Sequence, residues 1–159
     1  MAWRGSTTVK DRIFASLPYL LPIISALPFG NFLLNQFPAL RVVLLPLTPV
    51  LFIYNAMGPF AGIIIFFLLF LLVVRNERIA HFIRFNTMQA ILLDILLVLC
   101  SLLLDILLRG LGTNLVTETL LNIIFLGTIA ACGYSIVQSL LGRYAEIPTL
   151  SEAVHAQVR

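Results

Sequence analysis

The sequence predicts an all-α, polytopic membrane protein: one membrane domain over residues 1–159 with four transmembrane helices. Hydrophobic residues make up 60% of the chain and charged residues 11%, whereas soluble domains carry roughly 25% charge. Four apolar runs are each long enough to cross a hydrocarbon core of about 30 Å as a helix. A chain of 159 residues has little length left for a soluble domain beside them.

The first span is predicted at residues 13–29, after a short basic lead. Prolines at positions 18, 22 and 28 remove backbone hydrogen bonds, so we expect this span to be kinked. A basic start followed by an apolar run is also typical of a secretory signal peptide. The three prolines and the lack of an A-x-A cleavage site argue against that alternative.

Residues 30–55 are predicted to form an interfacial, amphipathic or re-entrant segment between the first and second spans. Prolines divide this stretch into short pieces, which disfavours one straight helix. The polar residues scattered through it are Asn31, Asn35, Gln36 and Arg41. A true additional span is the alternative.

The remaining spans are predicted at residues 56–74, 87–108 and 115–141. The second is an uncharged run of nineteen residues that stops at Arg75. A basic connection leads to the third span, and a glycine-containing turn separates the third from the fourth.

The polar tail, residues 142–159, is predicted to contain a short amphipathic helix. Thr149 and Glu152 have the spacing of a capping box. Its apolar side would lie on the membrane or on a partner. The apolar residues of this helix are Leu150, Ala153, Val154 and Val158.

The positive charges predict the orientation of the chain. With these four spans, eight of the ten Lys and Arg residues lie on the side of the two termini and two on the other side. Since positive charge is retained inside, both termini are expected on the cytoplasmic or stromal side. A fifth span between residues 40 and 55 would remove this asymmetry, so four spans are favoured.

The third span carries a polar stripe. At 100° per residue, Thr87, Asp94, Ser101 and Asp105 fall within about 20° of one line on a helix. A carboxylate that faces lipid costs on the order of 2–4 kcal/mol, so the stripe is expected to face protein or water. The alternative is structural, with the two acids paired to arginines such as Arg84 and Arg109.

We take as candidate partner contacts the polar residues at the start of the third span, its stripe, and two residues four apart in the last span. These are Arg84, Asn86, Thr87, Gln89, Asp94, Ser101, Asp105, Glu118 and Asn122. No catalytic motif, cofactor site or metal site is predicted. Nucleic-acid binding is not expected either, because no basic patch has aromatic residues between its charges.

The block Arg84–Ala90 (RFNTMQA), followed by Asp94 and preceded by Val74-Arg75-Asn76, resembles the third span of a known family. The family is the twenty-kilodalton membrane subunit of the chloroplast inner-envelope translocon (Tic), with its cyanobacterial and plastid-encoded relatives. The resemblance extends over nearly the whole chain. Its supporting pieces are Leu17–Pro22 (LPYLLP), Gly30-Asn31-Phe32, Gln36-Phe37-Pro38 and Ile147-Pro148.

The resemblance implies a non-enzymatic membrane subunit that takes part in protein translocation or membrane insertion. Its partners would be membrane lipids, other membrane-protein subunits and a translocating polypeptide. The implied location is a cyanobacterial plasma or thylakoid membrane, or the plastid inner envelope. Because the first span begins at residue 13, no long transit peptide precedes it, which favours a cyanobacterial or plastid-encoded member.

Two other functional classes stay open. The chain is alternatively a structural or assembly partner of a larger membrane complex, for example a photosynthetic one. An ion-coupled transporter is the third class, in which Asp94 would be the membrane-embedded acid.

Overall fold

A computed structural model of the chain describes residues 7–158; Arg4 of the predicted basic lead and Arg159 of the tail lie outside them. Over that range the chain forms helices and no strands, as predicted. The first helical segment is nearly continuous and begins at a capping box between Thr8 and Asp11. It comprises α1 (Val9–Ser16), η1 (Leu17–Tyr19), α2 (Leu20–Ala26), η2 (Leu27–Gly30) and α3 (Asn31–Gln36).

Two of the three prolines in this segment stand in short 3₁₀ helices, and the third, Pro22, lies within α2. Pro18 and Pro28 each stand in the first turn of a 3₁₀ helix, η1 and η2 respectively. A proline lacks the N–H that an α-helix would use, and the first turn is where that N–H is not needed. At Pro18 and Pro28, the structure therefore has a short 3₁₀ turn where a kink was predicted.

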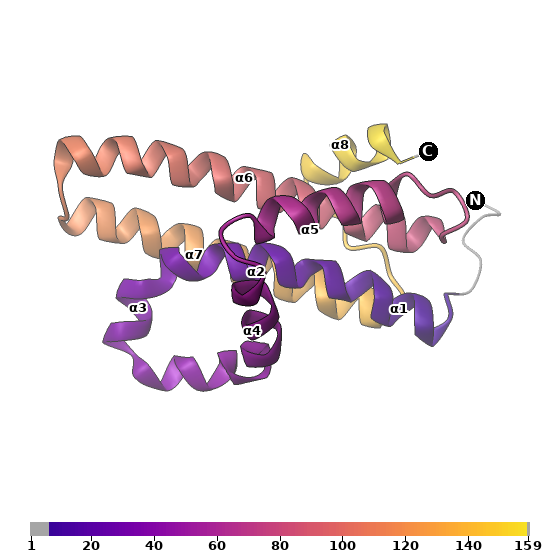
Figure 1. Cartoon of the computed structure of the whole chain (residues 1–159), viewed down its shortest axis with the longest axis horizontal. Helices are drawn as coiled ribbons and strands as arrows, with labels where there is room; N and C mark the ends of the chain where they lie inside the picture. Colours follow the sequence, from indigo (N-terminus) through magenta and orange to yellow (C-terminus); the bar gives the residue numbers. More distant parts are fainter. Residues whose placement is uncertain (1–6, 159) are drawn as a thin grey trace.

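The longest elements are α6 (His81–Leu111) and α7 (Leu115–Leu140), which form an antiparallel hairpin (Figure 1). Gly112 ends α6 with φ of 68°, a conformation that glycine adopts without steric cost. Asn114 then caps α7, because its side chain accepts hydrogen bonds from the backbone N–H groups of Val116 and Thr117.

The other elements pack along this hairpin. The segment α1–α2 contacts both α6 and α7. The helix α5 (Ala61–Leu69) continues into a π-helical end, η4 (Phe70–Val74), which packs against α6. The tail returns over α6 as α8 (Leu150–Gln157), near the end of the bundle that holds both termini (Figure 1).

Four helices are long and apolar enough to cross a membrane: Val9–Gln36, Pro38–Ala56, His81–Leu111 and Leu115–Leu140. The structure differs from the prediction at the second span. The uncharged run 56–74 is divided by a turn at Met57–Phe60, where Gly58 has φ of 81° and Pro59 follows. The helix after the turn, Ala61–Val74, has 14 residues and a length of about 21 Å, less than the hydrocarbon core.

The segment predicted to be interfacial forms an arch on one side of the bundle, which we define as residues 31–56. It consists of α3, the 3₁₀ helix η3 (Pro38–Leu47) and α4 (Thr48–Ala56). Figure 1 shows the chain leaving the bundle along α3, turning along η3 and returning along α4. No residue of η3 or α4 is buried, although their combined length and composition would suffice for a span.

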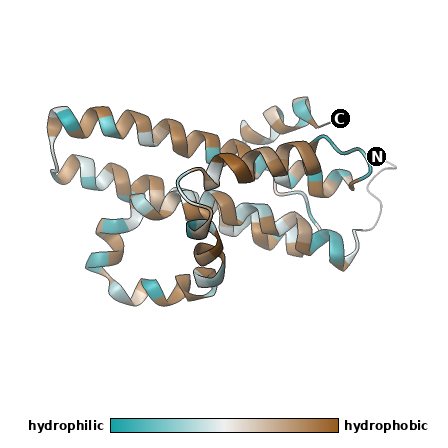
Figure 2. Ribbon diagram, in the orientation of Figure 1, coloured by the Kyte–Doolittle hydropathy of each residue, from teal (hydrophilic) through white to brown (hydrophobic). Residues whose placement is uncertain are grey.

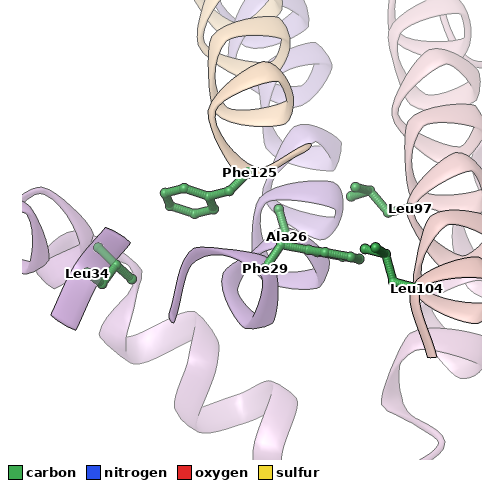
Figure 3. Close-up of a cluster of buried hydrophobic side chains, with 6 residues drawn as sticks. All are labelled: Ala26, Phe29, Leu34, Leu97, Leu104 and Phe125. Atoms are coloured by element: carbon green, nitrogen blue, oxygen red, sulfur yellow. The ribbon is translucent and has the colours of Figure 1, made fainter. Parts of the chain in front are cut away.

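Three buried clusters hold the bundle together. The first joins α2, η2 and α3 to the hairpin: Leu97 and Leu104 from α6 and Phe125 from α7 meet Ala26 and Phe29 (Figure 3). Its contacts are tight, since a Cβ at Gly30 would lie 2.7 Å from the ring of Phe125. The second cluster joins η4, α6 and the tail. The third joins η1, α2, α6 and α7.

The tail helix differs from its prediction in two respects. Thr149 is the N-cap residue of α8, but its side chain makes no cap hydrogen bond, so the predicted capping box with Glu152 is wrong. The backbone of Thr149 has φ of 72°, whereas a capping side chain needs an extended backbone. The apolar side of α8 also packs on the chain itself: Val154 and Val158 are buried against Phe85 and its neighbours.

The outer surface of the hairpin is apolar. Residues such as Leu103, Ile106 and Ile123 are each more than 60% exposed, an arrangement suited to lipid contact. Figure 2 shows hydrophobic colour over most of α5, α6 and α7. The polar colour gathers mainly in the loops, the tail and parts of the arch.

Candidate functional site: buried polar network, polar grooves and arch

A buried polar network ties the start of α6 to both ends of the chain. The hydroxyl of Tyr19 donates to Asn86 Oδ1 at 2.8 Å, and Ser139 Oγ donates to the same oxygen at 3.1 Å. Gln89 Nε2 donates to the Tyr19 hydroxyl at 2.9 Å and to the carbonyl of Ala145 at 2.7 Å. All five residues have no exposed surface. The network therefore crosses from η1 through α6 to α7 and the tail.

Arg84 and Thr87 belong to the same turns of α6 but have other surroundings. Arg84 is buried, and its Nε donates to the carbonyl of Val74 at the end of η4, at 2.8 Å. Thr87 is fully buried, and its Oγ1 has no hydrogen-bond partner among the described residues. The motif RFNTMQA thus supplies the contacts that hold α5, α7 and the tail against α6.

The polar stripe of α6 divides into parts with different environments. Asp94 is 7% exposed and accepts a hydrogen bond of 2.5 Å from Ser25 Oγ of α2. Asp94 lies ten residues beyond Arg84, about 15 Å along the helix, so the proposed pairing of these two residues does not occur. Asp105 is exposed, and it forms no ion pair with Arg109 within residues 7–158.

A polar groove continues the stripe toward the far end of α6. It has a volume of about 420 Å³ and lies between η2, α6 and α7. Ser25, Ser101 and Asp105 supply its polar lining, next to apolar residues such as Phe29 and Leu121. Asp94 bonds to Ser25 at the border of this groove, so three of the four stripe residues follow one side of α6.

Glu118 and Asn122 are both half-buried on α7 and make no hydrogen bond with each other in the described chain. Asn122 Oδ1 is buried and has no partner among the described residues. The structure does not bring this pair together with the network around Tyr19, which lies toward the other end of α7.

The arch encloses a hollow that was not predicted from the sequence. This arch hollow has a volume of about 580 Å³ and lies between η3, α4 and the end of α2. Arg41 hydrogen-bonds to Asn35 across the bend of the arch. The polar residues that line the hollow are Asn31, Arg41, Thr48, Tyr54 and Asn55. Several of these polar residues were noted in the sequence as scattered through residues 30–55. Only the fold shows that they line one hollow.

A second feature is an apolar groove of about 600 Å³, which we call the lateral groove. It lies between α1–α2 and α5, with Ile83 and Thr87 of α6 as its floor and α4 at one end. Its lining is apolar except for Thr87 and Tyr54. In the sequence, these apolar lining residues cannot be distinguished from those of any membrane helix.

In the described part of the chain, the side chains that commonly bind metal ions are not gathered at one place. No three His, Cys, Asp or Glu side chains there are placed to hold a metal ion. Cys100 and Cys132 are free, and Cys132 is packed in the third cluster. The described residues form a polar groove, the arch hollow and the lateral groove on an apolar bundle.

The fold and these features define a multi-pass α-helical membrane protein with a buried polar core. Residues 8–154 match the family model described as "Chloroplast import apparatus Tic20-like". The chain belongs to the Tic20 family, a family of plastid protein-import translocon components whose members work with other membrane proteins.

Individual relatives cover almost all of this chain. It is 52% identical to a Tic20 family protein of Synechocystis sp., over 100% of this chain and 99% of the relative. It is 34% identical to the protein TIC 20-II, chloroplastic, of Arabidopsis thaliana, over 96% of this chain and 74% of that protein. It is also 34% identical to the Tic20 family protein Ycf60 of Gracilaria tenuistipitata var. liui, over 95% and 76%. Family members therefore occur in cyanobacteria, plants and red algae.

Proposed function

We propose that this chain is a non-enzymatic membrane subunit that takes part in protein translocation or membrane insertion, with the arch hollow as part of the path. The observation that carries the proposal is the group of five polar residues among the twelve that line the arch hollow, in a segment with the composition of a membrane span. Polar and charged groups at membrane depth are costly unless they face water, protein or a passing chain. A hydrated hollow offers a translocating polypeptide hydrogen-bonding partners that lipid lacks.

Other subunits complete this path. The arch has no buried residue in η3 or α4, so its outer face is available to a neighbouring membrane protein. The hollow is also too small to pass a folded domain, since one turn of helix about 10 Å wide fills about 400 Å³. An extended chain with partner subunits around it fits this space.

Site-specific photo-crosslinking tests the path. A photo-reactive residue at Thr48 or Asn55 would face the hollow, whereas the same residue at Phe52 or Val43 would face outward, since those side chains are exposed and do not line it. We expect a precursor arrested during passage to cross-link from the first pair and not from the second. Equal cross-linking from both pairs would contradict a path through the hollow.

Purification of the tagged protein from its native membrane in mild detergent tests the function as a whole. Translocon components, or nascent and precursor chains, are expected among the co-purifying proteins. Stable co-purification in fixed proportion with a photosynthetic or other assembled complex, without such chains, would make the protein a structural partner instead.

A further inference from the structure

The shape of the lateral groove restricts what it can hold. Its lining extends from Phe14 to Ile24 along α1–α2, about 15 Å at 1.5 Å per residue. The groove has a volume of about 600 Å³ along that length, a shape that suits a long and flexible ligand.

The chemistry of the lining argues against an extended polypeptide. Each residue of such a chain would bring one N–H and one C=O group, and both need partners away from water. The groove offers only the hydroxyl groups of Thr87 and Tyr54, and its other lining residues are apolar. A flexible hydrocarbon chain has no such requirement, and it can fill a narrow apolar groove.

One polar atom in the groove has no partner inside the chain. Thr87 is fully buried and lines the floor of the groove, while its Oγ1 makes no hydrogen bond among the described residues. A buried hydroxyl without a partner costs free energy, so an acceptor from a ligand would stabilise it. The ester carbonyl of a membrane lipid is such an acceptor, and it adjoins the acyl chain.

Two exposed basic residues are close in sequence to residues that line the groove. Lys10 is exposed and one helical turn from Phe14 on α1, and Arg78 is exposed and directly precedes the lining residue Ile79. Both belong to the end of the bundle where the termini lie (Figure 1). Two acids are nearby: Asp11 accepts the backbone N–H of Thr8, and Glu77 precedes Arg78. Lys10 and Arg78 are nevertheless exposed and could contact the headgroup of a lipid in the groove.

We propose that the lateral groove is a binding site for one anionic membrane lipid. Its acyl chain lies between α1–α2 and α5, its ester carbonyl accepts a hydrogen bond from Thr87, and its phosphate contacts Lys10 and Arg78. The lipid would fill the space between the first helical segment and the short helix α5. This inference is independent of the arch hollow and of the proposed translocation function.

Native mass spectrometry of the delipidated full chain, titrated with phosphatidylglycerol, tests the acyl site. The variant Ile65→Trp fills the groove, whereas Ile64→Trp places the same side chain on the exposed neighbouring position. We expect Ile65→Trp to weaken binding about tenfold, which corresponds to the loss of about two buried methylene groups. Ile64→Trp should leave the affinity unchanged. Equal affinities in both variants would overturn the proposal.

A second variant keeps the test valid even if a tryptophan disturbs the fold. Replacing the two exposed cations, Lys10→Gln with Arg78→Gln, should lower the affinity for phosphatidylglycerol to that for phosphatidylcholine with the same chains. Arg109→Gln, at the other end of α6, is the matched control. No preference for the anionic lipid in the unmodified protein would refute the headgroup contact. Loss of precursor cross-links in Ile65→Trp with unchanged lipid affinity would assign the groove to a polypeptide instead.

Discussion

The two halves of α6 have opposite environments on one continuous helix. Between His81 and Asp94 nearly every residue is buried, and the polar residues there bond to η1, η4, α7 and the tail. Between residues 95 and 111 only Leu97 and Leu104 are buried. The first half is thus the centre of the fold, and the second half is a surface for lipid or other subunits. Most polar residues of the first half bond to other parts of the chain, so we expect substitutions there to act mainly on stability.

The largest effect is expected from the first half of α6. Gln89→Ala removes two hydrogen bonds and leaves a cavity, so we expect the free energy of unfolding to fall by about 3 kcal/mol. Denaturation in micelles, followed by circular dichroism, measures this loss. Asp105→Ala on the second half should change it by less than about 0.5 kcal/mol. Similar effects for both variants would mean that the two halves do not differ as described.

A close helix contact gives the next effect. Gly30→Ala brings a Cβ to 2.7 Å from the Phe125 ring, so overpacking should cost about 2 kcal/mol. Gly127→Ala is the control on α7, because a Cβ there meets nothing within 4 Å. Thermal denaturation monitored by size-exclusion chromatography compares the two. A neutral Gly30→Ala would indicate that η2 does not pack against α7 in the membrane.

A smaller effect is expected at the border between the halves. Ser25→Ala removes the hydrogen bond to the buried Asp94 and should cost about 1 kcal/mol. Ser101→Ala, on the exposed half, should cost less than about 0.5 kcal/mol.

Asp94→Asn tests whether Asp94 has a structural role or a role in transport. Normal stability together with the loss of a proton-coupled flux would support the transporter alternative.

Labelling of single cysteines should change stability least and define the topology. In a background without Cys100 and Cys132, Lys10→Cys, Asn76→Cys and Glu146→Cys are expected to react with an impermeant maleimide from the side of the termini. Thr113→Cys, in the turn between α6 and α7, should react from the other side. Labelling of Lys10→Cys and Asn76→Cys from opposite sides would mean that the arch adds a complete crossing to that of α5.

Hydropathy and helical periodicity predicted much of this fold, because long apolar runs such as 87–108 and 115–141 leave the chain few alternatives to a helix. The dipeptide Gly58-Pro59 is a turn signal, but the prediction rested on the length and lack of charge of the run 56–74 and placed one helix across it. Helical periodicity placed Thr87 and Asp105 on one face of the third span. Which neighbour each residue meets depends on helix packing, so the division into a network, a polar groove and a lateral groove needed three dimensions.

The carbonyl of Ala145 has a consequence for biosynthesis. Tyr19 and Gln89 are made early, but the acceptor that completes their network belongs to the last fifteen residues of the chain. While Ala145 is still inside the ribosome, the helices already inserted therefore lack this hydrogen bond. The finished arrangement is reached only after Ala145 has left the ribosome, so a chain that lacks residues 142–159 should insert into the membrane and then be degraded faster than the chain that carries them.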